Sequence, residues 1–130
     1  MILLDTHVLI WWANGEQDRL SNTAIAAIEA EEQQRLVSAI SCWEVAMLVD
    51  RGRLGLSVDV ERWLHLVASI PRLQLLPLSP TVAVASTRLP GTFHADPADR
   101  FLVTQARDLN IPLVTADSKI RAYPHVRSLW

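Results

Sequence analysis

Five short apolar runs constrain the fold of this chain more than any other feature of its sequence. They are apolar nearly throughout rather than alternating, and longer helical patterns separate them. Strands of this kind are typical of a sheet buried on both faces, and strand–helix alternation is typical of parallel strands. We therefore predict an α/β fold with a central parallel sheet and helices on both faces. The expected strands are Ile2–Leu4, Leu36–Ile40, Leu73–Leu78, Ile111–Thr115 and, as a short edge strand, Val126–Leu129.

Polar caps and helix-ending residues delimit the segments between these strands. Ser21 has the N-cap position of one predicted helix and Ser41 that of the next. Gly52, Pro71, Pro90 and Asn110 follow the predicted helix ends, where glycine, proline and asparagine are favoured. The expected helices are 22 to about 32, Cys42–Arg51, Val60–Ile70, Pro80–Arg88 and Pro97–Leu109.

Composition narrows the class of protein. A length of 130 residues predicts one domain spanning residues 1–130. Half of the residues are apolar, which is enough to form a hydrophobic core. No apolar run approaches the roughly 18 residues of a membrane span, and the N-terminus lacks the basic region of a signal peptide. The single cysteine, Cys42, excludes an internal disulfide. We expect a cytoplasmic protein without a membrane partner.

The net charge of −2, with only one lysine, disfavours a protein that coats nucleic acid through many phosphate contacts. It is compatible with a metal-dependent nuclease, because the active site of such an enzyme is itself acidic. If the chain binds RNA, bound cations or a localised arginine patch must offset its acidic residues.

Acidic residues follow the predicted strands at the points where the strands end. Asp5 comes directly after the first strand, Glu44 one helical turn after the second, and Asp117 two residues after the fourth. Asp96 and Asp99 begin the helix that leads into the fourth strand. In open parallel sheets, ligands bind outside the carboxyl ends of the strands. The sequence therefore predicts an acidic cluster at that edge of the sheet.

Each acid also has a plain structural interpretation as a helix cap, which is favoured when the acids are taken singly. Ser41 and Glu44 have the spacing of a capping box, in which Glu44 reaches back to the Ser41 amide. Asp96 and Asp99 would occupy the N-cap and N3 positions of their helix. The remaining acids would cap the helices after them: Asp5 one beginning at Thr6, and Asp117 the short helix Ser118–Ala122.

Two observations favour the cluster over capping alone. Glu44 lies in the segment 42–49, whose seven other residues are apolar, and a buried unpaired charge there is costly. Asp99 shares a helix face with Val103 and Ala106, so it is expected to point inward. Acids that converge without matching bases repel one another unless a divalent cation joins them.

Oxygen ligands without a cysteine or histidine cluster favour Mg²⁺ or Mn²⁺. Such a cation activates water and neutralises charge on a phosphate oxygen, so hydrolysis of a phosphodiester is the expected reaction. Thr6 and Thr115 are expected either to orient a metal ligand or a bound water, or to serve only as a cap and a strand residue. The four histidines, His7, His65, His94 and His125, are interpreted as structural or surface residues because they lack metal-ligand spacing.

Four segments together resemble the PIN-domain ribonucleases, and specifically the VapC-type toxins of bacterial toxin–antitoxin pairs. They occur in the family's order and span the whole chain. One departure is Ala116, where larger polar residues are common, and it puts nothing essential in doubt. The segments are Leu3–Trp12, Ser38–Val45, His94–Ala106 and Leu113–Asp117.

The resemblance implies a three-layer α/β/α sandwich and RNA cleavage with Mg²⁺ or Mn²⁺. It further implies a homodimer and a VapB-like antitoxin whose C-terminal segment blocks the site. Asp96 also matches a family acid, and we interpret it as an N-cap or as support for a ligand. Arg100 is expected to steady the acids or to contact phosphate. The residues implied to bind the metal are Asp5, Glu44, Asp99 and Asp117.

The tryptophans carry two further expectations. Trp43 is predicted to pack in the core or at an interface because its neighbours are apolar, although base stacking is an alternative for it and for Trp11 and Trp12. The stretch Trp43–Leu56, together with Trp63, is predicted to form a groove for an amphipathic antitoxin helix.

Other classes of protein also place acids at strand ends. A receiver-like regulatory module would need paired acids after the first strand and an aspartate after the third, where this chain has Ser79 and Pro80. A haloacid-dehalogenase-like phosphatase would need an aspartate at position 7, which is histidine. A catalytically idle PIN-fold binding module remains an alternative, although such a module has no reason to keep four acids.

Overall fold

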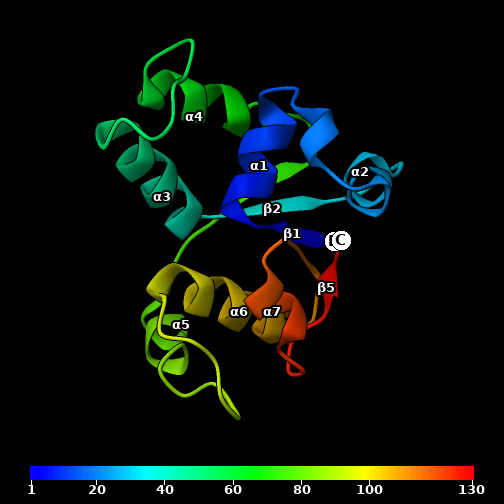
Figure 1. Ribbon diagram of the computed structural model, residues 1–130, viewed down its shortest axis with the longest axis vertical. Coiled ribbons are helices and arrows are strands. Elements are labelled where there is room, and N and C mark those ends of the chain that lie inside the picture. Colours follow the sequence, from blue (N-terminus) through cyan, green and yellow to red (C-terminus); the bar gives the residue numbers. More distant parts are fainter.

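A computed structural model describes residues 1–130 and contains one five-stranded sheet in which all neighbouring strands are parallel. The strand order is β3-β2-β1-β4-β5, so β1 lies at the centre. Helices cover both faces of the sheet (Figure 1), which confirms the predicted three-layer α/β/α fold. The strands are β1 Ile2–Leu4, β2 Arg35–Ser38, β3 Leu73–Leu76, β4 Leu113–Val114 and β5 Ser128–Leu129.

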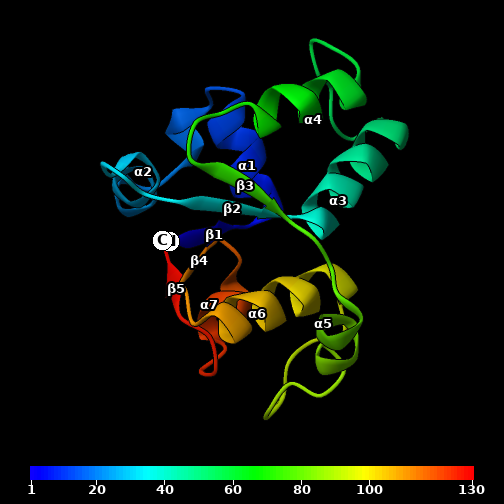
Figure 2. The same ribbon diagram turned by 180° about the vertical axis from the view of Figure 1, so that it is seen from behind.

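The helices divide between the two faces. Figures 1 and 2 show α1, α2, α3 and α4 on one side of the sheet and α5, α6 and α7 on the other. None of these helices is long and apolar enough to cross a bilayer. Their bounds are α1 Thr6–Ala13, α2 Asn22–Glu29, α3 Ala39–Asp50, α4 Val60–Ala68, α5 Pro80–Ala85, α6 Pro97–Leu109 and α7 Ser118–Ala122, with a short 3₁₀ turn η1 at Gln17–Arg19.

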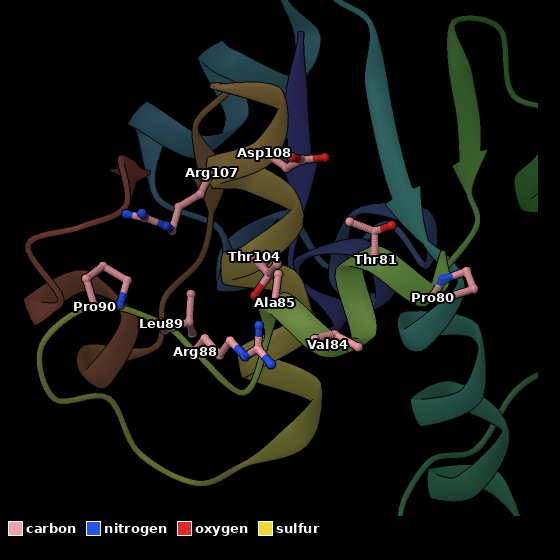
Figure 3. Close-up of a pocket in the computed structure, with 10 residues that line it drawn as sticks. All are labelled: Pro80, Thr81, Val84, Ala85, Arg88, Leu89, Pro90, Thr104, Arg107 and Asp108. Carbon is pink, nitrogen blue, oxygen red and sulfur yellow. The ribbon is translucent and has the colours of Figure 1, made fainter.

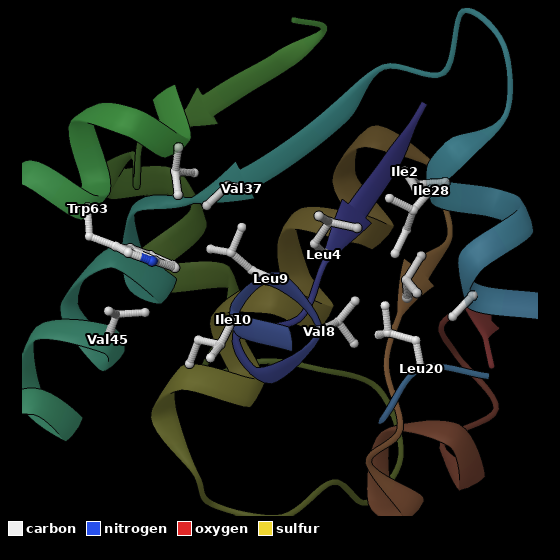
Figure 4. Close-up of a cluster of buried hydrophobic side chains, with 13 residues drawn as sticks. Ile2, Leu4, Val8, Leu9, Ile10, Leu20, Ile28, Val37, Val45 and Trp63 are labelled. Carbon is white, nitrogen blue, oxygen red and sulfur yellow. The ribbon is translucent and has the colours of Figure 1, made fainter. Parts of the chain in front are cut away.

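Two apolar cores explain why the strands are apolar throughout. Successive side chains of a strand point to opposite faces of the sheet. Leu4 therefore packs with α1 and Trp63 in one core (Figure 4), whereas the preceding Leu3 packs with Leu102 and Ile120 in the other. Both faces of β1 are therefore buried, which accounts for its wholly apolar sequence.

The strand order separates this fold from a receiver-like module. In a receiver, β1 lies between β2 and β3. Here β1 pairs with β2 and β4, and β3 is an edge strand on the far side of β2. The third strand therefore cannot contribute a side chain beside the end of β1, and the receiver-like alternative is wrong.

The junction between β2 and α3 differs from the prediction. The strand ends at Ser38, whose hydroxyl accepts a hydrogen bond from the Ile40 amide at 3.2 Å and caps the helix. Ser41 is therefore a buried residue inside α3 and not its N-cap. Glu44 stands in the second turn of the helix, so the predicted capping box between Ser41 and Glu44 is wrong. Serine is a favoured N-cap residue, and the helix begins after Ser38 rather than after Ser41.

Candidate metal centre

The predicted acids converge at the carboxyl edge of the sheet. Asp5 follows β1 and Asp117 follows β4, and these two strands are neighbours. Glu44 reaches the same edge from α3, which follows β2 on the other side of β1. Helix α6 brings its first turn to the same place. One cavity, here named the acid cavity, is lined by Asp5, His7, Val8, Trp11, Glu44, Asp96, Asp99, Ala116 and Asp117.

Asp5 is buried and held by two donors. Its Oδ1 accepts a hydrogen bond from the Thr6 amide at 2.7 Å, so it also caps α1 as predicted. Its Oδ2 accepts a hydrogen bond from the Thr115 hydroxyl at 2.6 Å. Burial raises the pKa of Asp5, and the hydrogen bonds from Thr115 and Thr6 act against that rise. The carboxylate is therefore fixed in position before any cation binds.

Glu44 is partly buried and depends on Thr6. The Thr6 hydroxyl lies 2.5 Å from Glu44 Oε1 and 2.9 Å from the Ser41 hydroxyl. A hydroxyl has one proton to donate. The shorter contact to a carboxylate is the better use of that proton, so Ser41 donates to Thr6 in turn. Burial raises the pKa of Glu44, and the Thr6 hydrogen bond opposes the rise.

Asp99 lies among the other acids of the cavity and is partly buried. Burial raises its pKa to about 7, and repulsion from Asp5, Asp96, Asp117 and Glu44 adds to the effect of burial. No lysine or arginine nitrogen lies within 4.0 Å of any of these carboxylates. Without a cation, Asp99 is therefore about half protonated at neutral pH.

Asp96 and Asp117 combine capping with a place in the cavity. Asp96 Oδ1 accepts a hydrogen bond from the Asp99 amide at 3.1 Å, which confirms it as the N-cap of α6. Asp117 Oδ1 accepts from the amides of Lys119 and Ile120 at 2.9 and 3.0 Å and caps α7. The capping and cluster interpretations are therefore compatible, because a carboxylate has two oxygens and a cap occupies one.

The two threonines tie the ends of the strands together. Thr115 is fully buried, and its hydroxyl donates to Asp5 while accepting from the Asp117 amide at 3.0 Å. Thr6 links α1 to Glu44 on α3. Both hydroxyls thus contact acids of the cavity, which agrees with the expectation that the threonines orient metal ligands.

Arg100 does not contact the acids, so the first of its two predicted roles is wrong, and contact with phosphate stays a prediction. Its Nε donates to the carbonyl of Ser86 at 2.8 Å, and its Nη1 lies 3.0 Å and 3.1 Å from the carbonyls of Phe93 and His94. The loop before α6 has no strand or helix partner for these carbonyls, and the guanidinium supplies the missing donors. Arg100 therefore shapes the loop that precedes α6.

His94 is the residue of the site that sequence reasoning missed. Its Nε2 lies 2.9 Å from Oδ2 of Asp99. Ligand atoms of His94, Asp99 and Asp117 all lie within 4.8 Å of one another, a spacing that suits a metal ion. The prediction that His94 is only structural rested on spacing along the sequence. The available signal was its position two residues before Asp96, at the start of the third segment.

Trp43 is 56% exposed, so of its two predicted packing positions the core is wrong, and packing at an interface stays a prediction. The buried residues of α3 include Ser41 and Val45. Trp43 lies two positions from each, and at 3.6 residues per turn it therefore points to the opposite side of the helix. An apolar neighbourhood in the sequence did not reveal this.

A groove lies beside Trp63, but of the predicted stretch Trp43–Leu56 only Leu54–Leu56 line it. It is an apolar groove between the end of α1, the loop after α3 and α4. Its lining residues are Ala13, Asn14, Glu16, Leu54–Val58, Trp63, Leu66, Val67 and Ile70.

A further cavity lies far from the acids, between α5 and α6 (Figure 3). Its only acid is Asp108, and Arg88 and Arg107 also line it. It therefore lacks the donor set of a Mg²⁺ or Mn²⁺ site. The acid cavity fits such an ion, because it gathers carboxylate oxygens that repel one another. His94 does not line this cavity, but its Nε2 lies 2.9 Å from the Asp99 carboxylate at the edge of the cavity.

Comparisons with known proteins agree with this geometry. Residues 2–126 match the PIN domain family. The chain is 37% identical over 131 aligned residues to ribonuclease VapC22 of Mycobacterium tuberculosis, covering 99% of this chain and 98% of that protein.

Solved structures share the fold at lower identity. A crystal structure of VapBC2 from Rickettsia felis, bound to a promoter DNA fragment, matches with a TM-score of 0.70 and 18% identity over 98% of this chain and 97% of that one. VapC20 of Mycobacterium tuberculosis, a toxin that cleaves the sarcin–ricin loop, matches with a TM-score of 0.68 and 16% identity over 98% and 99%. Because the family model matches nearly the whole chain and a relative is 37% identical over its full length, the chain belongs to the PIN domain family, among the VapC proteins.

Proposed function

We propose that this chain is a Mg²⁺- or Mn²⁺-dependent endoribonuclease and the toxin of a type II toxin–antitoxin pair. The observation that carries the proposal is the acid cavity, in which five carboxylates meet and none forms an ion pair with a lysine or arginine. The similarity to a protein named ribonuclease VapC22 supports the choice of RNA as substrate.

Four carboxylates would hold the cation: Asp5, Glu44, Asp99 and Asp117. When bound, a divalent cation lowers the pKa of water and neutralises charge that develops on a phosphate oxygen. Thr115 and Thr6 keep Asp5 and Glu44 aimed at the cavity, so no reorganisation of these side chains is needed. Asp96 caps α6 and thereby fixes the turn from which Asp99 enters the cavity.

Contacts to RNA would lie around the rim of the acid cavity. Trp11 lines the cavity and His7 contacts its ring with a centroid distance of 5.9 Å. Aromatic rings of this kind stack on unpaired bases. Trp43, on the same helix as Glu44, is exposed and offers a second ring. These contacts suit a single-stranded substrate.

The partners proposed for this chain are an antitoxin of the VapB type and a second copy of the chain. Several similar structures are toxin–antitoxin complexes, which supports the antitoxin. The apolar groove beside Trp63, in which Leu66 is 43% exposed, has the character expected for an amphipathic helix of that partner. We also propose that the chain forms one domain and acts in the cytoplasm, where RNA is present.

The test is cleavage of RNA by the purified, antitoxin-free chain with Mg²⁺, with Mn²⁺ and with EDTA. The variant Asp5→Asn should be folded and inactive. The matched control is Asp108→Asn, since Asp108 is an exposed aspartate on α6 but lines the other cavity. Metal-dependent cleavage by the wild type and the control alone supports the proposal. A folded and active Asp5→Asn variant would refute it, and a folded wild type without activity would favour an idle binding module.

A further inference from the structure

His94 differs from the other groups of the site because it is a nitrogen donor among carboxylates. It lies in the loop before α6, and its side chain is 22% exposed. Its Nε2 lies 2.9 Å from Oδ2 of Asp99, within the usual range of a hydrogen bond. The distance alone suggests a simple histidine–aspartate pair.

The geometry of the pair does not fit a hydrogen bond. Although the two atoms are close, Nε2 is buried and has no hydrogen-bond partner of acceptable angle. The two atoms are therefore in close contact without a hydrogen bond between them. Two ligands of one cation have this relation, because bond lengths near 2.1 Å at right angles place neighbouring ligand atoms about 3 Å apart. Asp117 supplies a third atom within 4.8 Å.

The ring of His94 is held where it stands. The His94 carbonyl accepts a hydrogen bond from Arg100, which also contacts the carbonyl of Phe93. The ring of Phe93 meets that of His94 edge to face at 4.5 Å and packs on Tyr123 at 4.7 Å. His7, the other histidine at the cavity, is exposed. Only His94 thus combines a buried nitrogen with a fixed ring.

We infer that His94 is a ligand, through Nε2, of the divalent cation held by Asp99 and Asp117, and that it makes the site prefer Mn²⁺ to Mg²⁺. The inference rests on the proposed function and adds a specificity-determining residue to it. Imidazole favours transition metals, whereas Mg²⁺ is best bound by oxygen alone. A set of carboxylates without His94 would discriminate less between the two ions.

The experiment uses the purified chain with Mn²⁺ alone and reads the metal by pulsed electron paramagnetic resonance. Nitrogen-14 coordinated to Mn²⁺ modulates the electron spin echo, whereas carboxylate ligands do not. The wild type and the control His7→Gln should show this modulation, and His94→Gln and His94→Ala should lack it. Calorimetric titration should show the ratio of Mg²⁺ to Mn²⁺ dissociation constants falling about tenfold in His94→Gln. Circular dichroism establishes that each variant is folded.

The outcomes separate this inference from the proposed function. If Mn²⁺ binds in a way that Asp5→Asn abolishes, but without nitrogen modulation in the wild type, His94 is not a ligand and the proposed metal site stands. If the folded wild type binds no Mn²⁺, both fail. Modulation lost in His7→Gln and kept in His94→Ala would assign the nitrogen to His7 and overturn the inference. If neither His94 variant folds, the spectrum of His7→Gln decides by itself.

Discussion

The two halves of the acid cavity treat their carboxylates differently. In the hydrogen-bonded half, Asp5 and Glu44 receive donors from Thr115 and Thr6. In the open half, the Asp99 carboxylate receives no hydrogen bond and faces His94 without one. Hydroxyl donors oppose the rise in pKa of Asp5 and Glu44, whereas burial and repulsion from the other acids together raise the pKa of Asp99 to about 7. A cation in the open half would relieve that repulsion.

The largest effect should come from removing the charge of the open half. We predict that Asp99→Asn lowers metal-dependent RNA cleavage by more than about 100-fold, beyond the 10- to 100-fold typical of residues that only support a ligand. Single-turnover cleavage at saturating Mn²⁺ measures this. Asp108→Asn on the same helix should cleave like the wild type. An Asp99→Asn variant within about tenfold of the wild type would remove the distinction between the halves.

A smaller effect should follow from breaking the hydrogen-bonded half. Thr115→Val keeps the shape of the side chain but leaves the buried Asp5 carboxylate without its second donor. We expect a loss of about 1–3 kcal/mol in the free energy of unfolding and a 10- to 100-fold loss of cleavage. Thr104→Val is the control, because that buried hydroxyl contacts only the Arg100 carbonyl. Equal behaviour of the two variants would show that the Asp5 contact is unimportant.

The pH dependence of stability should expose the open half in the absence of metal. The pKa of Asp99 is about 7 in the folded chain against an ordinary value of 3.8, so the folded state binds more protons between these values. The free energy of unfolding in EDTA should therefore fall as pH rises from about 4 to about 7, by on the order of 4 kcal/mol. The raised pKa values of Asp5 and Glu44 act in the same direction.

Urea titrations at several pH values measure this slope. Asp99→Asn should flatten it and should be more stable than the wild type at pH 7.5, since the repulsion is relieved. Saturating Mn²⁺ should reverse the slope, because the metal binds the ionised carboxylates. A wild type whose stability in EDTA rises from pH 4 to pH 7 would contradict the assignment of Asp99.

The smallest effect should come from Arg100, which acts on the open half through the loop that carries His94. Arg100→Lys retains the charge but cannot reach three carbonyls in the same way. We predict a loss of about 1 kcal/mol in stability and a few-fold weaker Mn²⁺ affinity, measured by calorimetry. Were Arg100 instead a phosphate contact, the lysine variant would keep its Mn²⁺ affinity and lose only RNA binding.

Much of the hydrogen-bonded half could be predicted from sequence because its residues follow strand ends directly. Asp5 after β1 and Thr115 after β4 are placed by the sheet itself, and parallel pairing makes them neighbours. The inward direction of Asp99 could also be predicted, because helical periodicity places it on the inner face of α6. Local rules of strand, cap and helix face were sufficient for these positions.

The missed features depend on contacts that local rules do not contain. Ser38 and Ser41 are both residues that favour an N-cap, and the structure uses Ser38; Trp43 points away from the buried side of the same helix. His94 lies in a loop whose path is set by Arg100 from the following helix. A residue in such a loop has no periodicity to reveal its direction, so its place in the site needed the structure.

The most direct test of the account is a crystal of this chain grown with Mn²⁺ and measured for anomalous scattering from the metal. The account predicts an anomalous peak in the open half of the acid cavity, in contact with Asp99 and with Nε2 of His94. A crystal with full diffraction but no peak at the acids, at a Mn²⁺ concentration that supports RNA cleavage, would contradict it.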